Sequence, residues 1–229
     1  MGAYAGLSSF FNGSNGSLRD YAIRYGYDDS NIIILEGNEA SLRENHLQIY
    51  NNLLSCRHHS DNRTPIQYGQ DLVASWVFED YFLNELKDTG LNISLSGADR
   101  NRAILPNQRT STSSDYIITM ASGCQIQMEL VNDYTGFWAR TGKLHLRDNK
   151  YPRLRDNGCL LLAIALTPQT QKYALFDFRE EIHATFLPRH EPWSRPGKDK
   201  AAYELEVLPE MLQDFSITNI KDHIERILQ

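Results

Sequence analysis

An unbroken apolar run, Cys159–Leu166, constrains the fold of this chain more than any other segment. Its eight residues, CLLLAIAL, contain no polar side chain. A bilayer crossing needs about 20 apolar residues, so the run is too short to span a membrane. A continuous apolar run, in place of strict alternation, is typical of a strand that is covered on both faces. The turn Thr167–Thr170 leads into a second strand-like segment, Lys172–Phe178, so we expect a buried sheet.

A β-hairpin is expected upstream of this run. Tyr116–Met120 is rich in β-prone residues, Ser122-Gly123 is a turn signal, and Gln125–Leu130 alternates between polar and apolar residues. In a strand, alternate residues face opposite sides of the sheet. Ile126, Met128 and Leu130 would therefore face one side, and Gln125, Gln127 and Glu129 the other.

The clearest helical pattern covers Gly69–Lys87. Its apolar stripe consists of Leu72, Trp76, Leu83 and Leu86, and Gly90 follows as a stop signal. Glu79 projects from the same stripe. A carboxylate on an apolar face is costly to bury unless it is paired, so Glu79 is either functional or bound to a structural arginine.

The remaining elements are predicted from shorter signals. Asn31–Leu35 suits a short strand, and Ser41–Leu54 suits one helix with Ser41 and Glu44 as a capping box. The C-terminal segment is expected to be helical over Pro209–Phe215 and Asn219–Leu228. Together these elements predict an α/β (α+β-like) fold with a central mixed β-sheet flanked by helices. We expect an N-terminal accessory region, 1–65, and a core that forms a single compact unit, 66–229.

Composition indicates a soluble, cytoplasmic protein. The first twenty residues lack a basic start and an apolar stretch, so no signal peptide is expected. Cys56, Cys124 and Cys159 are odd in number and lack paired spacing, as is typical of thiols in a reducing compartment. The net charge of −6 counts mildly against nucleic-acid binding without excluding it, because the distribution of charge matters more than the sum.

Two acids flank the expected hairpin. Asp115 precedes the first strand and Glu129 lies in the second, so both carboxylates can converge at one edge of the sheet. Two carboxylates and a backbone carbonyl make a hard, oxygen-rich site that suits Mg²⁺. Such an ion orients a phosphodiester and lowers the pKa of an attacking water. The spacing therefore indicates a candidate site for phosphoryl chemistry.

With Glu79, these acids resemble the motif of the PD-(D/E)xK nuclease superfamily, which includes most type II restriction endonucleases. Its core is a helix with an accessory Glu, then a hairpin with Asp, then Glu or Asp, any residue, and Lys. The resemblance covers roughly residues 66–178. It implies a restriction-endonuclease-like core and a Mg²⁺-dependent double-stranded DNA endonuclease. In that scheme Asp115, Glu129 and the Leu130 carbonyl bind metal, and Glu79 is an accessory ligand or orienting residue.

The chain departs from this motif at Val131, where the family has lysine. Valine cannot place a positive charge near the water or the phosphate. If residues 142–151 are helical, Arg147 and Lys150 lie one turn apart and can both approach Glu129. Lys150 is our first choice for the missing cation and Lys143 the second. The alternative is an inactive site.

Polar loop residues are candidates for contacts with DNA bases and phosphates. They lie before Asp115 and after the hairpin: Arg100, Asn101, Arg102, Asn107, Arg109, Arg140 and Arg147. The first 60 residues are expected to add further contacts. Palindromic cutting would require two active sites, which predicts a homodimer. A DNA methyltransferase acting on the same DNA sequence would be a functional companion and not a physical partner.

Simpler interpretations remain open for each residue. Asp115, after two serines, could be a turn or cap residue, and Glu129 could be solvated. His58-His59 could be a solvated part of a polar loop, because adjacent histidines rarely bind the same metal ion. Cys124 has no accompanying histidine motif, so it is not assigned as a nucleophile. The rival functions are a catalytically inactive nuclease-fold subunit that binds DNA, and a repair or recombination nuclease that acts on branched DNA.

Overall fold

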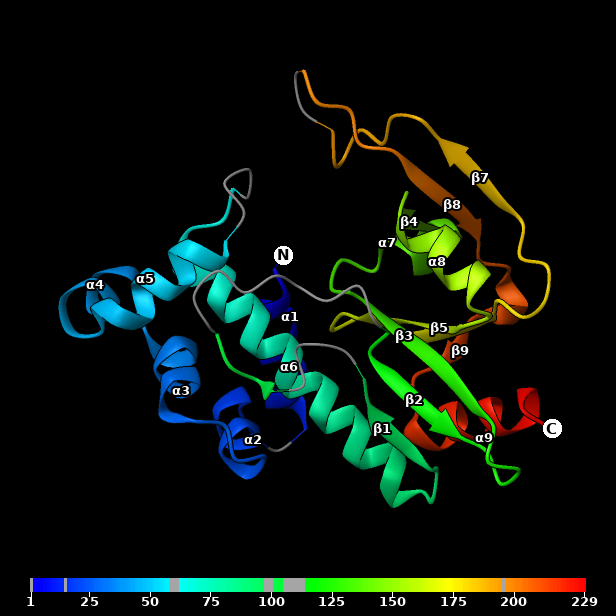
Figure 1. The fold of residues 1–229 in the computed structure, drawn as a ribbon, viewed down its shortest axis with the longest axis horizontal. Coiled ribbons are helices and arrows are strands. Elements are labelled where there is room, and N and C mark those ends of the chain that lie inside the picture. The colour runs from blue at the N-terminus through cyan, green and yellow to red at the C-terminus, as the bar shows by residue number, and fades with distance from the viewer. Residues whose placement is uncertain (1, 15, 58–61, 97–100, 105–113, 195–196) are drawn as a thin grey trace. The chain divides into compact units, whose positions relative to one another are not determined.

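The computed structural model describes residues 2–14, 16–57, 62–96, 101–104, 114–194 and 197–229. The chain divides into two compact units, drawn in Figure 1. The first unit takes residues 1–85 and 96–113, and the second takes residues 86–95 and 114–229. This division does not fall at residue 65, and most of the long helix belongs to the first unit.

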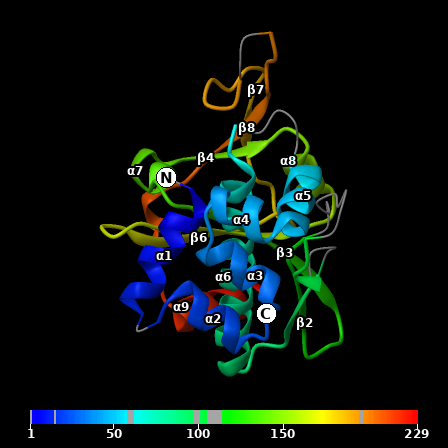
Figure 2. The ribbon, with the colours of Figure 1, turned by 90° about the vertical axis from the view of Figure 1, so that its left-hand side faces the viewer.

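The first unit is helical in its described residues. Short helices lie in front of and beside the long helix in Figure 2. They are α1 (Ala3–Gly13), α2 (Leu18–Arg24), α3 (Asp29–Glu36), α4 (Glu39–Asn45), α5 (Leu47–Cys56) and α6 (Pro65–Asp88). The helix predicted over 69–87 is confirmed as α6. Thr64 and Gln67 cap its start, each accepting the other's backbone N–H through its side chain. Val73, Val77, Phe78 and Phe82 are fully buried along it.

Two predictions in the first unit are wrong. Residues 31–35 form α3 and not a strand, because the Asp28 carboxylate caps the helix by accepting the Asn31 N–H at 3.0 Å. The cap and the burial of Ile34 override the β preference of three isoleucines. Residues 41–54 are split into α4 and α5 at His46, whose φ of −138° is not helical. The capping box there joins Asn38 and Ser41, and not Ser41 and Glu44.

The second unit is built on a mixed six-stranded sheet in the order β1-β2-β3-β5-β6-β9. The strands are β1 (Ile93–Leu95), β2 (Tyr116–Thr119), β3 (Gln125–Asp133), β5 (Leu160–Leu166), β6 (Gln171–Asp177) and β9 (Gln213–Asp214). β3 and β5 are parallel, and the other neighbours are antiparallel. β5 is buried along its whole length, which confirms the buried strand expected from the apolar run.

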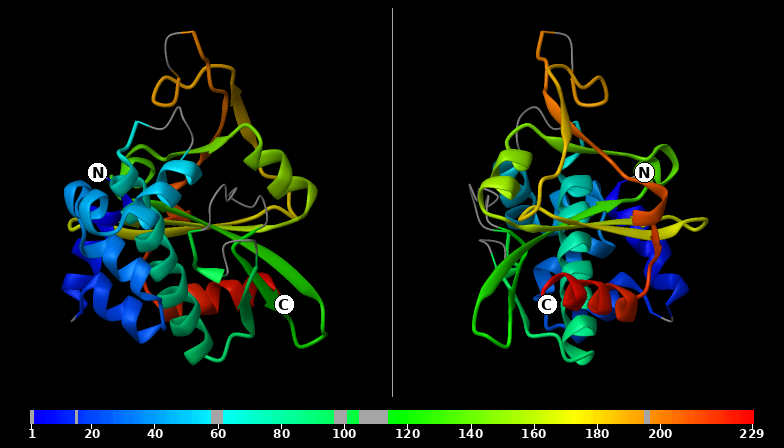
Figure 3. Two further views of the ribbon diagram at one scale, coloured as in Figure 1. Left: turned by 60° about the vertical axis from the view of Figure 1, so that its left-hand side comes forward. Right: turned by 90° about the vertical axis from the view of Figure 1, so that its right-hand side faces the viewer.

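Layers on both faces explain this burial, as Figure 3 shows. α9 (Ile217–Ile227) lies on one face, where the Tyr173 hydroxyl donates to the Asn219 carbonyl. The other face carries α8 (Lys150–Asp156) and a three-stranded sheet in the order β4-β8-β7. Its strands are β4 (Lys143–Arg147), β8 (Ala202–Glu206) and β7 (Ala184–Leu187), and the short helix α7 (Phe137–Thr141) precedes β4. The predicted mixed sheet with helical cover is confirmed.

Two further predictions in the second unit are wrong in part. Residues 142–151 are not one helix, because 143–147 form β4 and α8 begins at Lys150. Residues 209–215 contain one 3-10 turn, Pro209–Met211, followed by β9. Pro152 lies in the first turn of α8, where its missing N–H costs no helical hydrogen bond. The helix expected near 219–228 is confirmed as α9.

Candidate functional site

The β2–β3 hairpin carries both predicted acids near its open end. Tyr116 lies opposite Met128, and Ile117 lies opposite Gln127. Asp115 directly precedes β2, and Glu129 directly follows Met128 on β3. The turn that sets this register contains Gly123 at φ 84°, a conformation that favours glycine.

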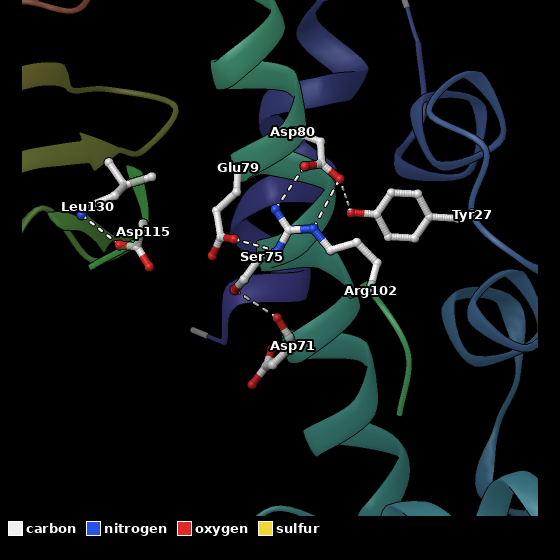
Figure 4. A network of polar contacts seen from close by, with 8 residues as sticks. All are labelled: Tyr27, Asp71, Ser75, Glu79, Asp80, Arg102, Asp115 and Leu130. Atoms are coloured by element: carbon white, nitrogen blue, oxygen red, sulfur yellow. Dashed lines mark hydrogen bonds and ion pairs between the residues drawn. The ribbon is translucent and has the colours of Figure 1, made fainter. Parts of the chain in front are cut away.

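Asp115 is fixed by the strand it faces. Its Oδ2 accepts the backbone N–H of Leu130 at 2.7 Å (Figure 4). This bond lies beyond the last paired residues of the hairpin, Tyr116 and Met128, so a side chain, and not the backbone of β2, receives the Leu130 N–H.

Glu129 is buried, and two cations neutralise it. Its side chain is 7% exposed, Lys150 Nζ lies 2.6 Å from Oε1, and Arg153 Nη2 lies 2.8 Å from Oε2. Burying an ionised carboxylate costs on the order of several kcal/mol unless partners offset its loss of water. The solvated interpretation of Glu129 is therefore wrong.

Both cations come from one turn of α8. Lys150 and Arg153 are three residues apart, the spacing at which helical side chains share a face. The structure thus places the first-choice cation, Lys150, at Glu129. The expected companion was wrong: Arg147 ends β4 and is exposed, and Arg153 takes its place. The Lys150–Arg153 spacing could have revealed Arg153 once the helix start was known.

A small polar group lies beside these charges. Ser114 Oγ donates to Gln127 Oε1 at 3.0 Å, and Cys159 Sγ lies 3.8 Å from each of these oxygens. Burial raises the pKa of the Cys159 thiol above its usual range. Since a thiol is a weak nucleophile unless it is deprotonated, Cys159 belongs to the scaffold of the site. Sequence reasoning missed this group.

Val131 occupies the same face of β3 as Glu129, two residues further along. It packs against the apolar cluster that includes Leu144, Leu154 and Leu161. A cation at this position would lie among apolar side chains, which is unfavourable. Packing thus accounts for an apolar residue at this position.

The other basic candidates of the second unit lie elsewhere. Lys143, the second-choice cation, pairs with Glu204 at 3.0 Å across the three-stranded sheet. Arg140 donates to the Thr135 carbonyl at 2.6 Å. Neither residue is joined to Glu129 by a described contact, whereas Lys150 is.

Glu79 belongs to the first unit and takes part in an ion network there. Arg102 donates a hydrogen bond to Glu79 at 2.7 Å. Two other guanidinium nitrogens donate to the Asp80 carboxylate at 2.8 and 3.2 Å (Figure 4). Tyr27 donates to the same Asp80 carboxylate at 2.6 Å. Of the two alternatives for Glu79, the structure shows the ion pair with an arginine. Arg102, 11% exposed in its side chain, is corrected from a DNA contact to an anchor of this network.

Several sequence candidates lie outside the described residues. These are Arg100, Asn107, Arg109 and the pair His58-His59. Asn101 is described and exposed, so it stays available as a contact residue.

The acids at the hairpin are the predicted ligands of a divalent cation. Within the described ranges, no three His, Cys, Asp or Glu side chains gather closely enough to hold a metal ion. Mg²⁺ needs fewer, because proteins commonly hold it with one or two carboxylates together with substrate phosphates. Asp115, Glu129 and the Leu130 carbonyl are the predicted donors, and their role as metal ligands stays a prediction.

Comparison with known proteins assigns no family. A scan of the chain against protein-family models finds no match, and a search of curated proteins finds no relative. In the described part of the chain, no helix combines the length and the apolar character that a bilayer crossing requires. The residues of the site are thus the basis for any functional conclusion.

Proposed function

We propose that this chain is a Mg²⁺-dependent endonuclease that hydrolyses double-stranded DNA in a sequence-specific manner, in the way of type II restriction enzymes. One observation carries the proposal: Lys150 lies on Glu129, and Glu129 and Asp115 flank the last residue pair of the β2–β3 hairpin, Met128 and Tyr116. Two acids and a lysine are the side chains of the PD-(D/E)xK motif, here with the lysine supplied by α8. The order of helix, hairpin and buried strand also supports a restriction-endonuclease-like core.

Each residue has a role in this proposal. Asp115, Glu129 and the Leu130 carbonyl would hold the ion, which when bound supplies positive charge for the phosphate and a more acidic water. Lys150 would donate hydrogen bonds to the attacking water or to a phosphate oxygen, replacing the lysine absent at Val131. Arg153 would orient Glu129, since its planar guanidinium holds a fixed geometry. Glu79 pairs with Arg102, and its role as accessory ligand or orienting residue stays a prediction.

The remaining assignments follow from the proposed activity. Asn101, Arg140 and Arg147 are the described candidates for DNA contacts, and a homodimer would supply two active sites for a palindromic DNA sequence. Such an enzyme would work in the cytoplasm, with a methyltransferase protecting the same sequence in host DNA.

A non-catalytic DNA-binding subunit is the second candidate. It is favoured by Val131 and by the engagement of both Glu129 oxygens by cations. In that case Lys150 and Arg153 would serve only to stabilise the fold.

A panel of substrates tests these candidates. Purified protein is incubated with plasmid DNA, a four-way junction and single-stranded DNA, with Mg²⁺ or with EDTA. The proposal expects discrete plasmid fragments with Mg²⁺, lost in Asp115→Asn and retained in the exposed control Asp88→Asn. Cleavage of junctions alone would favour a repair or recombination nuclease. Plasmid binding without cleavage under any divalent ion would favour the binding subunit and contradict the endonuclease.

A further inference from the structure

Two histidines and an acid are joined by hydrogen bonds in the second unit. His145 Nε2 lies 2.9 Å from Glu204 Oε2, and His145 Nδ1 lies 2.9 Å from His190 Nε2. The three residues come from three segments. His145 lies on β4, Glu204 lies opposite it on β8, and His190 lies in the connection between β7 and β8, residues 188–201. The proposed nuclease site uses none of them.

His190 anchors this connection. In the part of the connection that the structure describes, it is the one buried residue, with 5% exposure. Its ring centroid lies 4.1 Å from that of Trp193 and 4.4 Å from that of His145. Its backbone N–H donates to the Lys200 carbonyl at 2.8 Å. The connection is therefore tied to β4 through one imidazole.

The carboxylate fixes where the protons of the two histidines lie. Hydrogen bonds from His145 and Lys143 lower the pKa of Glu204, so its carboxylate is ionised near neutral pH and can only accept. His145 must therefore carry its proton on Nε2, which leaves its Nδ1 as an acceptor while the ring is neutral. His190 must then donate through its Nε2–H. In the neutral pair, Nδ1 of His190 thus carries no proton.

That nitrogen makes the pair intolerant of a further proton. His190 Nδ1 is buried, and it has no hydrogen-bond partner among the described residues. A proton that enters His190 goes to Nδ1. A proton that enters His145 lies between the rings, so His190 must move its own proton to Nδ1 to keep the hydrogen bond. Either way the pair gains a buried N–H for which the described residues offer no acceptor, and such a group is unfavourable.

The acid beside the pair does not offset this cost. Burial, and after it the neighbouring His145, lower the pKa of His190 below its usual range, although Glu204 acts in the opposite direction. Lys143 Nζ lies 3.0 Å from Glu204 Oε1. The negative charge of Glu204 is thus shared between a lysine and the histidine pair.

The remaining charges around the connection lie at the surface. Arg189 pairs with Glu191 and with Asp199, and Lys200 is half-buried. The other charged or titratable side chains beside this face of the three-stranded sheet, or in the described part of the connection, are exposed: Arg147, His183, Lys198 and Glu206. None of these side chains is joined to His190 by a described contact.

We propose that His190, His145 and Glu204 form a proton-sensitive latch. While both imidazoles are neutral, the latch holds the connection 188–201 on β4. When the pair takes up a proton, the hydrogen bond between His190 and His145 breaks and His190 leaves its buried position, so that water can accept from the new N–H. The latch does not depend on the proposed endonuclease activity.

Hydrogen–deuterium exchange at pH 7.5 and pH 5.5 tests the latch, with labelling times scaled for the effect of pH on intrinsic exchange. It follows the amides of His190 and Trp193, which donate to the carbonyls of Lys200 and His190. A released histidine takes up a proton with a pKa near the usual 6.5, so the open population, and with it the exchange rate, should rise about tenfold between these pH values. Peptides from the buried strand β5 are the internal reference and should stay protected.

Variants separate the latch from a general effect of acid. The side-chain amide of His190→Gln can donate to His145 or accept from it and takes up no proton, so the connection should stay protected at both pH values. His190→Ala removes the anchor and should exchange fast at both. His183→Gln removes an exposed histidine of the same unit and should exchange as wild type does.

Nitrogen NMR of the imidazoles tests the proton positions in wild type, which covers the case in which His190→Ala fails to fold. At pH 7.5 both His145 and His190 should carry their proton on Nε2. This readout is independent of any rate of exchange.

The outcomes are distinct. Faster exchange of the wild-type connection at pH 5.5, with protection retained in His190→Gln and Nε2–H on both rings, supports the latch. Equal protection of wild type at the two pH values overturns it. The same acid-induced loss in His190→Gln, or a proton on Nδ1 of His190 at pH 7.5, also overturns it.

Discussion

Asp115 Oδ2 accepts the backbone N–H of Leu130 at 2.7 Å, which ties the residue before β2 to the strand that carries Glu129. The bond connects residues 15 positions apart and lies beyond the last paired residues of the hairpin, Tyr116 and Met128. A backbone donor of this kind fixes a carboxylate without using another side chain. Asp115 is therefore held in place by the fold itself, as a metal ligand would require.

Replacement of Lys150 should abolish most of the proposed cleavage. Lys150→Met removes the ammonium beside Glu129, and loss of a positioned proton donor costs about 100-fold or more in rate. Lys143→Met, which removes a lysine paired with Glu204, should cleave at the wild-type rate. Single-turnover plasmid cleavage with Mg²⁺ measures both. Equal loss in the two variants would contradict the assignment of Lys150.

Arg102 should stabilise the first unit strongly. Arg102→Met leaves Glu79 and Asp80 without their shared partner, and breaking a buried ion pair costs about 3–5 kcal/mol. Arg19→Met removes an exposed pair with Glu36, for which about 0–1 kcal/mol is expected. Urea unfolding monitored by circular dichroism compares them. A loss below 1 kcal/mol in Arg102→Met would show that the network is not formed in solution.

Acid should weaken the second unit through two histidines. Burial lowers the pKa of His190 and of His223 below the usual 6.5; His145 adds to the effect at His190, and Arg226 at His223. Below about pH 6.5 the unfolded chain takes up these protons before the folded chain does. Their contribution to the free energy of unfolding is thus fully present above that pH and is lost as the pH falls through the lowered values.

Unfolding by urea at pH 7.5 and pH 5.5, about one unit on either side of the usual histidine pKa, measures this effect. His190→Gln should show a smaller loss on acidification than wild type, with the remainder due to His223. The exposed His183 serves as the control, and His183→Gln should behave as wild type. The same loss in His190→Gln as in wild type would rule out His190 as a source of the pH dependence.

Cys159 should resist thiol reagents in the folded protein. It is fully buried and its pKa is raised, whereas Cys124 is exposed. With Cys56 replaced by serine, we expect one thiol to react in native buffer and a second only after unfolding. Mass spectrometry of the labelled peptides identifies them. Rapid labelling of Cys159 would mean that the interior beside Glu129 is open to solvent.

Elements that are long or strongly patterned could be predicted from sequence. The apolar run of β5 and the alternation of polar and apolar residues in β3 are each typical of a β-strand. α3 could not be predicted, because a single cap at Asp28 and burial of Ile34 outweighed three β-branched isoleucines. The three-stranded sheet was also missed, since β7 and β8 are short and separated by a long connection.

The candidate site could be predicted in its acids and only partly in its cations. Asp115 and Glu129 flank a recognisable turn, so their places near the open end of the hairpin follow from hairpin geometry. Arg153 could not be identified, because its role depends on where α8 begins, and that boundary has no distinct sequence signal. Arg102 was assigned to DNA because composition alone does not show which arginine meets two buried carboxylates.

Mg²⁺-dependent cleavage of a supercoiled plasmid by wild type and Glu129→Gln, run side by side, tests the central claim most directly. Glu206→Gln, an exposed acid on β8, is the matched control. The account predicts discrete linear fragments from wild type and from Glu206→Gln, and intact plasmid with Glu129→Gln or with EDTA. Fragments of equal yield from Glu129→Gln, or an uncut plasmid with wild type, would contradict it.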